Sequence, residues 1–476
     1  MSERDFNENE LAETLFYRRK SVWEVAGAAE KEKIWHFADE YKNFLSYAKT
    51  ERKTVLAARD ILLSAGFQPL SEGAAPPLGS RLFWEVKKKA VIAAVMGDRP
   101  LEEGFNLVAA HIDSPRLDLK PHPAYEEEGL ALLKTHYYGG IKKYQWLSTP
   151  LALHGVVVKK DGSAVDITVG EDPGDPVFAI PDLLPHLARD QMEKKMSEAV
   201  LGEGLNVLAS SIPFKCSGGC GEVKEPVKRT LFSILYRRYG ITEEDLVSAE
   251  LQFVPAGPAR DVGVDHSLVG GYGQDDRACA YAALRAITGM AECRRTAVLV
   301  LADKEETGSC GNTGLESFLI LSFLSKIGVL SSKESAQLNV YQVLGNSWAL
   351  SADVNVGLDP NFLDVVEKGN TARLGCGVVI TKYTGSRGKY LTNDAHAETV
   401  ARVRLLFDSN GVIWQSGELG KVDQGGGGTV AHLLARYGMD VLDCGIALLG
   451  MHSPFEVASK ADIYMAYRAY STFFKA

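Results

Sequence analysis

The order of apolar and polar positions along the chain predicts its main elements. From Leu11 to about Phe67 apolar residues recur every three or four positions, which predicts two amphipathic helices. Helical spacing returns over 275–289 and 397–411. Strands buried on both faces are almost continuously apolar, and three runs have this character, at 91–97, 105–111 and 296–303. We therefore expect an α/β fold, with helices on both sides of a sheet.

The pattern changes between about Pro115 and Pro258, where short alternating segments are separated by Gly and Pro. Alternation of this kind predicts β-hairpins. The 476 residues also exceed the size at which one hydrophobic core stops growing. We expect a β-rich domain at 115–258, inserted into a discontinuous α/β domain formed by 1–114 and 259–476.

Composition and charge narrow the classes of protein. With 46% apolar and 24% charged residues the chain is typical of globular proteins, and its net charge of -9 argues against a nucleic-acid partner. Its longest apolar runs are shorter than the roughly 18 residues of a membrane span, so no membrane association is expected. The N-terminus does not have the order of a secretory signal, which predicts a cytoplasmic protein.

Cysteines offer one alternative metal site. Cys216 and Cys220 could form half of a zinc site, but no second Cys or His pair follows at the required spacing. Two reduced thiols in a loop are the other interpretation.

Metal-capable side chains follow predicted strands or begin predicted helices in five segments. Ligands gather at the carboxyl ends of strands in open α/β sheets, where distant segments converge. Imidazole nitrogen and carboxylate oxygen are the donors that zinc accepts. The candidates are His111, Asp113, Asp275, Asp276, Glu305, Glu306, Asp353 and His452.

The pair Glu305 and Glu306 follows the apolar run that ends at Asp303. One carboxylate can bind a metal while the other acts as general base toward the attacking water, as a peptide hydrolase requires. Two adjacent glutamates are otherwise typical of a solvated surface. Asp275 presents a similar choice, since an Asp at a helix start can be an N-cap as well as a ligand. No HExxH helix occurs, so that route to zinc hydrolysis is excluded.

The chain resembles the aspartyl aminopeptidase (aminopeptidase I) family of metallo-aminopeptidases along its length. The matching segments are AHIDSPRLDLKP, YYGGIKKYQW, IPDLLPHL, GQDDRACAYA, DKEETGS, SADVN, DQGGGG and MHSPFE. The resemblance implies a mixed-sheet zinc-peptidase catalytic domain of the phosphorylase/hydrolase-like type, with an inserted β-rich dimerisation domain. It also implies removal of an acidic or neutral N-terminal residue from peptides.

The resemblance implies two zinc ions per subunit, with cobalt or manganese as other possible metals. Asp275 would bridge them, although Asp276 is a rival for that position. His111 and Asp353 would complete the coordination of one ion, and Glu306 and His452 that of the other. Glu305 would be the general base for a water bridging the metals, and Asp113 would orient the ligands.

Oligomerisation is also implied by the resemblance. His186 matches a histidine of the inserted domain that reaches the active site of the neighbouring subunit and polarises the scissile carbonyl. A homo-oligomer is expected, with dimers built into a tetrahedral dodecamer. Its enclosed active sites would admit peptides and exclude folded proteins.

Substrate contacts are implied at four positions. Lys382 and Tyr390 lie where aspartate-preferring members bind the substrate carboxylate, although one extra residue separates them here. The segment after Asp353 lacks a histidine of those members, which leaves a preference for neutral residues open. Gly426 and Gly427 belong to a glycine run without a P-loop ending, and we expect a substrate-binding loop there.

Two other functions remain open at this point. A related di-zinc dipeptidase or carboxypeptidase would use nearly the same ligands. A catalytically inactive assembly protein could be built on the same fold, but the intact Glu305–Glu306 pair and all five ligand candidates argue against it.

Overall fold

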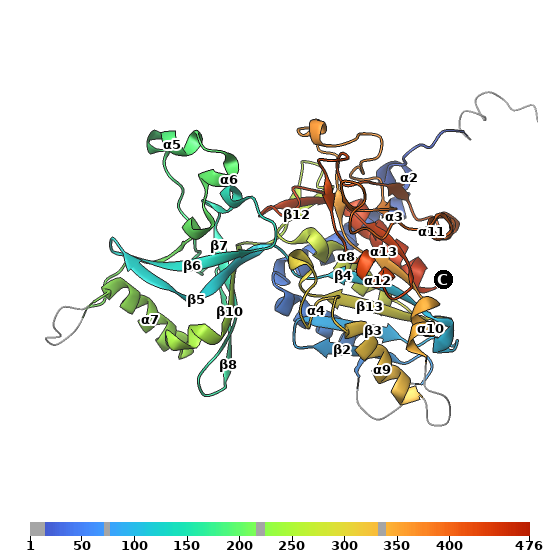
Figure 1. Cartoon of the computed structure of the whole chain (residues 1–476), viewed down its shortest axis with the longest axis horizontal. Coiled ribbons are helices and arrows are strands. Elements are labelled where there is room, and N and C mark those ends of the chain that lie inside the picture. Colours follow the sequence, from blue (N-terminus) through green and yellow to red (C-terminus); the bar gives the residue numbers. More distant parts are fainter. Residues whose placement is uncertain (1–14, 71–76, 216–223, 332–338) are drawn as a thin grey trace, which may run out of the picture.

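The computed structural model describes residues 15–70, 77–215, 224–331 and 339–476, which form two lobes of unequal size (Figure 1). Cys216 and Cys220, considered above as half of a metal site, lie outside the described residues. No helix in the described ranges is both long and apolar enough to span a membrane.

A nine-stranded mixed sheet forms the centre of the larger lobe. Its order is β1-β2-β3-β13-β4-β14-β20-β16-β18, and β13, β4, β14 and β20 run parallel to one another. The predicted apolar runs are three of its strands. The bounds are β1 Gln68–Pro69, β2 Arg81–Val86, β3 Ala90–Val95, β13 Thr296–Ala302, β4 Phe105–His111, β14 Trp348–Ser351, β20 Asp440–Gly445, β16 Val378–Thr381 and β18 Trp414–Ser416.

Helices cover both faces of this sheet, as the apolar runs predict. Val108 and Ala110 of β4 pack into one core, and Leu107 and Ala109 into the other. The first core is covered by α2 Val22–Val25, α3 Ala28–Tyr47, α4 Glu51–Ser64, α8 Gln274–Thr288, α11 Ala397–Ser409 and α13 Lys460–Phe474. The second is covered by α9 Leu319–Ser331, α10 Val340–Gly345 and α12 Ala431–Ala435.

A second, smaller sheet of the larger lobe has the order β11-β12-β22-β21-β15. Its strands are β11 Arg260–Val262, β12 Leu268–Gly271, β22 Glu456–Ser459, β21 Ala447–Leu449 and β15 Asn355–Val356. A short pair joins β17 Gly385–Ser386 to β19 Gly426–Gly427. The predicted glycine loop is therefore held as a strand against a neighbouring loop.

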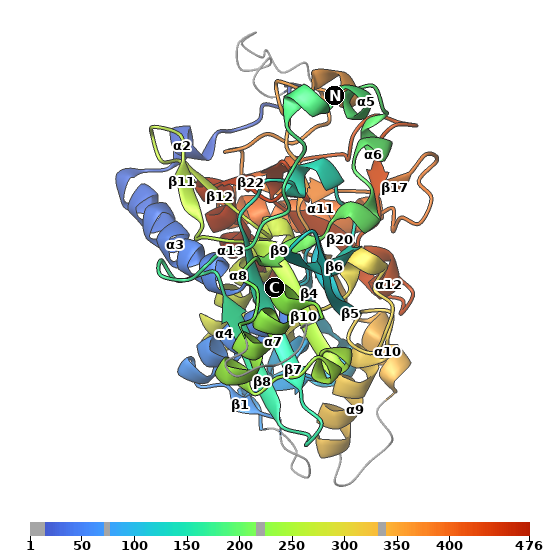
Figure 2. The ribbon, with the colours of Figure 1, turned by 90° about the vertical axis from the view of Figure 1, so that its left-hand side faces the viewer.

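The smaller lobe, which faces the viewer in Figure 2, contains a six-stranded sheet drawn from residues 116–255 alone. Its strands, in spatial order, are β8 Ala164–Val169, β7 Leu151–Val158, β10 Ala249–Pro255, β5 Arg116–Glu127, β6 Leu130–Tyr138 and β9 Val207–Ser210. Helix α7, Pro226–Tyr239, packs on β5, β6 and β9, and α5 Arg189–Met192 and α6 Met196–Ala199 lie nearby.

Single 3-10 turns link several of these elements. They are η1 Leu101–Glu103, η2 Lys143–Trp146, η3 Pro185–Leu187, η4 Gly202–Gly204, η5 Glu244–Ser248, η6 Glu305–Thr307 and η7 Leu363–Val365.

A buried carboxylate joins the two lobes. Glu51, in the first turn of α4, is fully buried and lies 3.1 Å from Lys89 Nζ and 3.5 Å from Arg116 Nη1. It also accepts a hydrogen bond of 3.0 Å from Gln252 Nε2. Burial alone would raise the pKa of Glu51, but the charges of Arg116 and Lys89 hold that pKa well below its ordinary value. Arg116 and Gln252 belong to the smaller lobe, so the charge network fixes one lobe on the other.

Glu51→Gln is expected to lower the free energy of unfolding at pH 7 by about 3 kcal/mol, because Lys89 and Arg116 each lose a buried anionic partner and keep only one carboxylate, Glu250 and Asp118 respectively. The folded pKa of Glu51 lies below the unfolded pKa of about 4.3, so its stabilisation is present above that pH. The difference between wild type and variant should shrink as the pH falls below about 4. Urea unfolding at several pH values measures it.

Glu244→Gln is the matched control, because Glu244 pairs with Lys160 while both side chains are largely exposed. That variant should unfold close to wild type. Equal losses in the two variants would contradict the role given to Glu51.

Candidate metal centre

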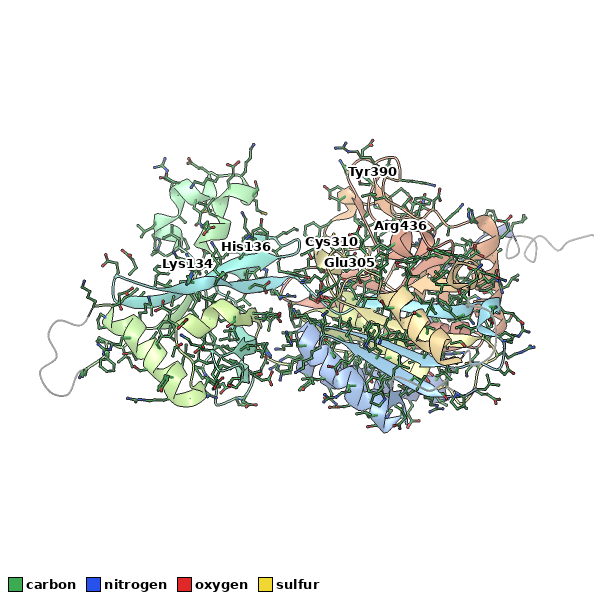
Figure 3. The ribbon with its side chains drawn as sticks, turned by 60° about the horizontal axis from the view of Figure 1, so that its bottom comes forward. Lys134, His136, Glu305, Cys310, Tyr390 and Arg436 are labelled. Carbon is green, nitrogen blue, oxygen red and sulfur yellow. The ribbon has the colours of Figure 1, made fainter. Side chains whose placement is uncertain are left out.

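Three neighbouring parallel strands bring the predicted residues to one edge of the large sheet. In the pairing of β4 with β13, His111 lies opposite Ala302, and in the pairing of β4 with β14, Ala109 lies opposite Ser351. The strands therefore end at nearly the same level. His111 ends β4, and the candidate residues that follow β13 and β14 lie at the same edge, as expected for the carboxyl ends of parallel strands. Glu305 lies on the side of the larger lobe that faces the smaller lobe (Figure 3).

Helix α8 supplies the carboxylate at the centre of the cluster. Asp275 is 3% exposed and keeps non-helical backbone angles at the start of the helix. Its Oδ1 lies 3.1 Å from His111 Nε2, and its Oδ2 lies 3.2 Å from His452 Nε2. The two oxygens of one carboxylate thus face two different imidazoles. A carboxylate in this position can bind one cation through each oxygen.

The remaining carboxylates divide between the two histidines. Glu306 Oε2 lies 3.5 Å from His452 Nε2. Asp353 Oδ1 and Glu305 Oε2 lie 3.8 and 4.0 Å from His111 Nε2. Among the described residues, two groups each have ligand atoms within 4.8 Å of one another, namely His111 with Asp275 and Glu306, and His111 with Asp276 and Asp353. The five predicted ligands are therefore brought together, with Asp276 beside them.

This cluster concentrates negative charge that no lysine or arginine of the described residues balances. Within the described part of the chain, every ion pair of Asp275, Glu305, Glu306 and Asp353 is made with a histidine. Burial raises the pKa of Glu306 and that of Asp353 well above the ordinary carboxyl value, and neighbouring carboxylates add to the rise. Like charges this close oppose ionisation unless a cation is added.

The donor set fits divalent cations such as zinc. Two imidazole nitrogens and several carboxylate oxygens are the ligand types that zinc binds. Glu306 Oε1 and both carboxylate oxygens of Asp276 are buried without a hydrogen-bond partner. Buried acceptors of this kind are costly unless a donor or a cation satisfies them.

Asp113 holds two of the candidate segments together. It is fully buried and accepts hydrogen bonds from the backbone N–H groups of Glu305, at 3.1 Å, and Glu306, at 3.2 Å. Its Oδ1 also lies 3.4 Å from His111 Nδ1. The carboxylate therefore contacts both the glutamate turn and the imidazole, and the role of Asp113 in orienting the ligands stays a prediction.

The smaller lobe contributes to the site through the end of β6. Tyr138 donates a hydrogen bond of 2.7 Å to Asp113 Oδ2, and His452 Nδ1 lies 2.8 Å from the backbone oxygen of Gly140. Because a carbonyl oxygen only accepts, Nδ1 carries the proton and Nε2 is left to bind a metal. Gly139 has φ +72°, and a Cβ there would lie 3.3 Å from Glu306 Oε2.

Glu456 is a further buried carboxylate that supports the ligands. It is 1% exposed and accepts from the backbone N–H groups of Gln274 at 2.6 Å, Asp275 at 3.2 Å and His452 at 2.7 Å. It thus ties the start of α8 to the His452 loop. The sequence analysis assigned no role to Glu456, Tyr138 or Gly140. In the sequence, Glu456 begins the segment EVAS, and Tyr138 and Gly140 belong to the segment YYGG. These two patterns were the available signals.

A cavity of about 620 Å³ opens beside the cluster. Tyr390, Gly426 and Gly427 line it together with Glu305. Lys382 instead lines a separate hollow of about 520 Å³, with Tyr383 and Glu418. His186 is exposed on the smaller lobe and does not line the cavity of its own chain.

Comparisons with known proteins identify the family of this chain. A family model described as aminopeptidase I zinc metalloprotease (M18) matches residues 44–474. "Probable M18 family aminopeptidase 1" of Clostridium acetobutylicum is 48% identical over 463 residues, which cover 96% of this chain and 98% of that protein. The crystal structure of an M18 aminopeptidase from Thermotoga maritima has a TM-score of 0.92 at 49% identity, covering 97% of this chain and 100% of the other.

The mApe1 dodecamer of S. cerevisiae is similar at 21% identity, with a TM-score of 0.74 over 92% of this chain and 96% of the other, and shows the fold alone. The α/β fold and the family expected from the sequence are confirmed. The family model and the near full-length relatives show that this chain belongs to the aminopeptidase I (M18) family of zinc metalloproteases.

Proposed function

We propose that this metallo-aminopeptidase removes an acidic or neutral N-terminal residue from peptides with two zinc ions that share Asp275. The observation that carries the proposal is the position of the Asp275 carboxylate, whose two oxygens face the Nε2 atoms of His111 and His452. Cobalt or manganese are alternative occupants, because the donors are imidazole and carboxylate.

In this proposal His111 and Asp353 would hold one ion, Glu306 and His452 would hold the other, and Asp275 would contribute an oxygen to each. Zinc held by these groups supplies Lewis acidity, which polarises the peptide carbonyl and lowers the pKa of a water molecule. Acidic side chains at the cluster that do not hold zinc, Glu305 among them, would attract the free amino group of a substrate. This is the electrostatic reason for an exopeptidase.

Glu305 is the proposed general base. Its side chain is 18% exposed, so Oε2 can reach both the cavity and the cluster. Burial raises the pKa of Glu305 above its ordinary value, which makes the carboxylate a stronger base. Glu305 takes the proton of the attacking water and returns it to the leaving amine. Asp113 keeps the carboxylate in place by binding the N–H of Glu305.

Oligomerisation is proposed from the surface of the smaller lobe. Large apolar side chains near His186 are exposed, among them Leu187, Met192 and Met196, at 68, 77 and 65%. Apolar surface of this kind favours burial against another copy. The yeast relative is a dodecamer, and we propose that this chain also forms a homo-oligomer, with dimers arranged as a tetrahedral dodecamer. In such an assembly His186 of one subunit would polarise the scissile carbonyl bound by its neighbour.

Asp275→Asn is expected to reduce bound zinc from two ions to one or none and to lower kcat/KM for aminoacyl nitroanilides at least about 100-fold. Elemental analysis of dialysed protein measures the metal. The adjacent Asp276→Asn is the matched control and should keep both ions. Greater zinc loss in the control would assign the bridge to Asp276.

Glu305→Gln should keep both zinc ions but lower kcat by about a thousandfold, because the variant cannot accept a proton. Steady-state kinetics and metal content are measured on the same preparation. Substantial retained turnover would reject Glu305 as the base.

His186→Ala should leave the assembly intact in size-exclusion chromatography with light scattering while kcat falls about 100-fold. His36→Ala removes another exposed histidine, which lies on α3 of the larger lobe, and should leave kcat unchanged. Full activity of the His186 variant in an intact oligomer would exclude the cross-subunit role.

A further inference from the structure

The cavity beside the metal cluster reaches the smaller lobe at one end. Gly308 and Ser309 line it directly after the turn that carries Glu305, and Gly140 lines it two residues after β6. In the proposed mechanism Glu305 returns a proton to the leaving amine, so the leaving part of the peptide begins beside Glu305. The peptide behind the cleaved bond would therefore leave past the end of β6.

Strand β6 leads away from this end of the cavity. Tyr138, its last residue, is tied to the site through the hydrogen bond to Asp113. Because side chains alternate along a strand, His136 and Lys134 lie on the same face as Tyr138, and both are exposed. Figure 3 shows Lys134 further than His136 from Glu305. At about 3.3 Å per residue, Lys134 lies about 13 Å from Tyr138 along the strand, which is the length of about four residues of an extended peptide.

Lys134 carries a charge that its surroundings leave unpaired. Two carboxylates of this region already have partners, since Asp118 pairs with Arg116 at 2.8 Å and Glu203 accepts hydrogen bonds of 2.8 and 2.6 Å from Lys120 Nζ. Lys134 itself forms no ion pair with any residue that the structure describes. Its charge is therefore available to a ligand.

The ring of Tyr125 supports the Lys134 ammonium group without neutralising it. Lys134 Nζ lies 5.1 Å from the centroid of that ring, a cation–π contact that leaves the N–H donors free. Lys142, two residues after Gly140, is exposed and likewise has no ion pair within the described ranges. The smaller lobe thus presents unpaired positive charge where a leaving peptide would pass.

We infer that Lys134 binds a carboxylate carried about four residues behind the cleaved bond, which makes it a specificity-determining residue for short peptides; the inference rests on the proposed aminopeptidase function. The C-terminus of a pentapeptide places its carboxylate at this distance, and an acidic side chain at the same position does so too. A longer peptide of neutral residues carries its carboxylate past Lys134 and gains nothing. Because the contact is exposed to solvent, its effect on binding is modest.

The test uses pentapeptides on the zinc-loaded full-length protein. Four Ala follow the first residue that the protein releases fastest from aminoacyl nitroanilides. At about 20 mM salt the free acid should have a kcat/KM about fivefold above that of the C-terminal amide, mainly through KM, because the contact lies far from the cleaved bond. The ratio should fall to about 1.5 at about 0.5 M NaCl, where screening is stronger. An amide whose last residue is Glu should regain the advantage of the free acid.

Equal kcat/KM for these three pentapeptides in low salt would overturn the inference. Aminoacyl nitroanilides carry no amino acid behind the cleaved bond, so their hydrolysis tests the proposed function separately. Nitroanilide turnover together with equal pentapeptide values would reject only the role of Lys134. No turnover of either kind of substrate would reject the aminopeptidase function as well.

Lys134→Gln should lower the acid-to-amide ratio to about one, because it removes the attracting charge. Lys160→Gln is the matched control, since it removes an exposed lysine of the same lobe that pairs with Glu244, and it should keep the wild-type ratio. A wild-type ratio in Lys134→Gln would contradict the inference. Light scattering is measured on both variants, and an altered oligomer in Lys134→Gln would assign this residue to a subunit contact and overturn the inference too.

Discussion

Mutual repulsion between buried carboxylates is the constraint on which the site depends. Asp275, Glu306 and Asp353 converge where β4, β13 and β14 end, and the described residues around them provide no lysine or arginine partner. The same holds for the two carboxylates that support these ligands. Asp113 and Glu456 are held by backbone N–H groups, which stabilise an anion without adding a full positive charge. The protein thus leaves the positive charge to be supplied by bound metal.

Much of the fold could be predicted because strands that are buried on both faces are almost continuously apolar in sequence. The apolar runs ending at His111 and Asp303 are central parallel strands, and parallel strands bring their carboxyl ends to one edge. That rule alone placed His111 near Glu305 and Asp353. Helix α7 was not predicted, since its sequence lies in a region where alternating strands dominate the pattern.

Contacts between distant segments could not be predicted in the same way. Tyr138 and Gly140 reach Asp113 and His452 because two lobes pack together, and nothing local in YYGG reports that packing. Lys382 and Tyr390 are close in sequence but border different hollows, because the chain turns between them. Asp275 and Asp276 are adjacent at one helix start, and only their three-dimensional directions separate them. The spacing of residues along the chain does not indicate the direction in which each side chain points.

The hydrogen bond between His452 and the Gly140 backbone also constrains how this protein can evolve. The insertion is joined to the rest at its two ends, like a module that could be exchanged. Yet it also sets the tautomer of an imidazole in the other lobe. Exchange of the insertion for another of equal size would therefore preserve the architecture but remove the contact that orients the His452 imidazole. The two lobes are thus constrained to evolve as one unit.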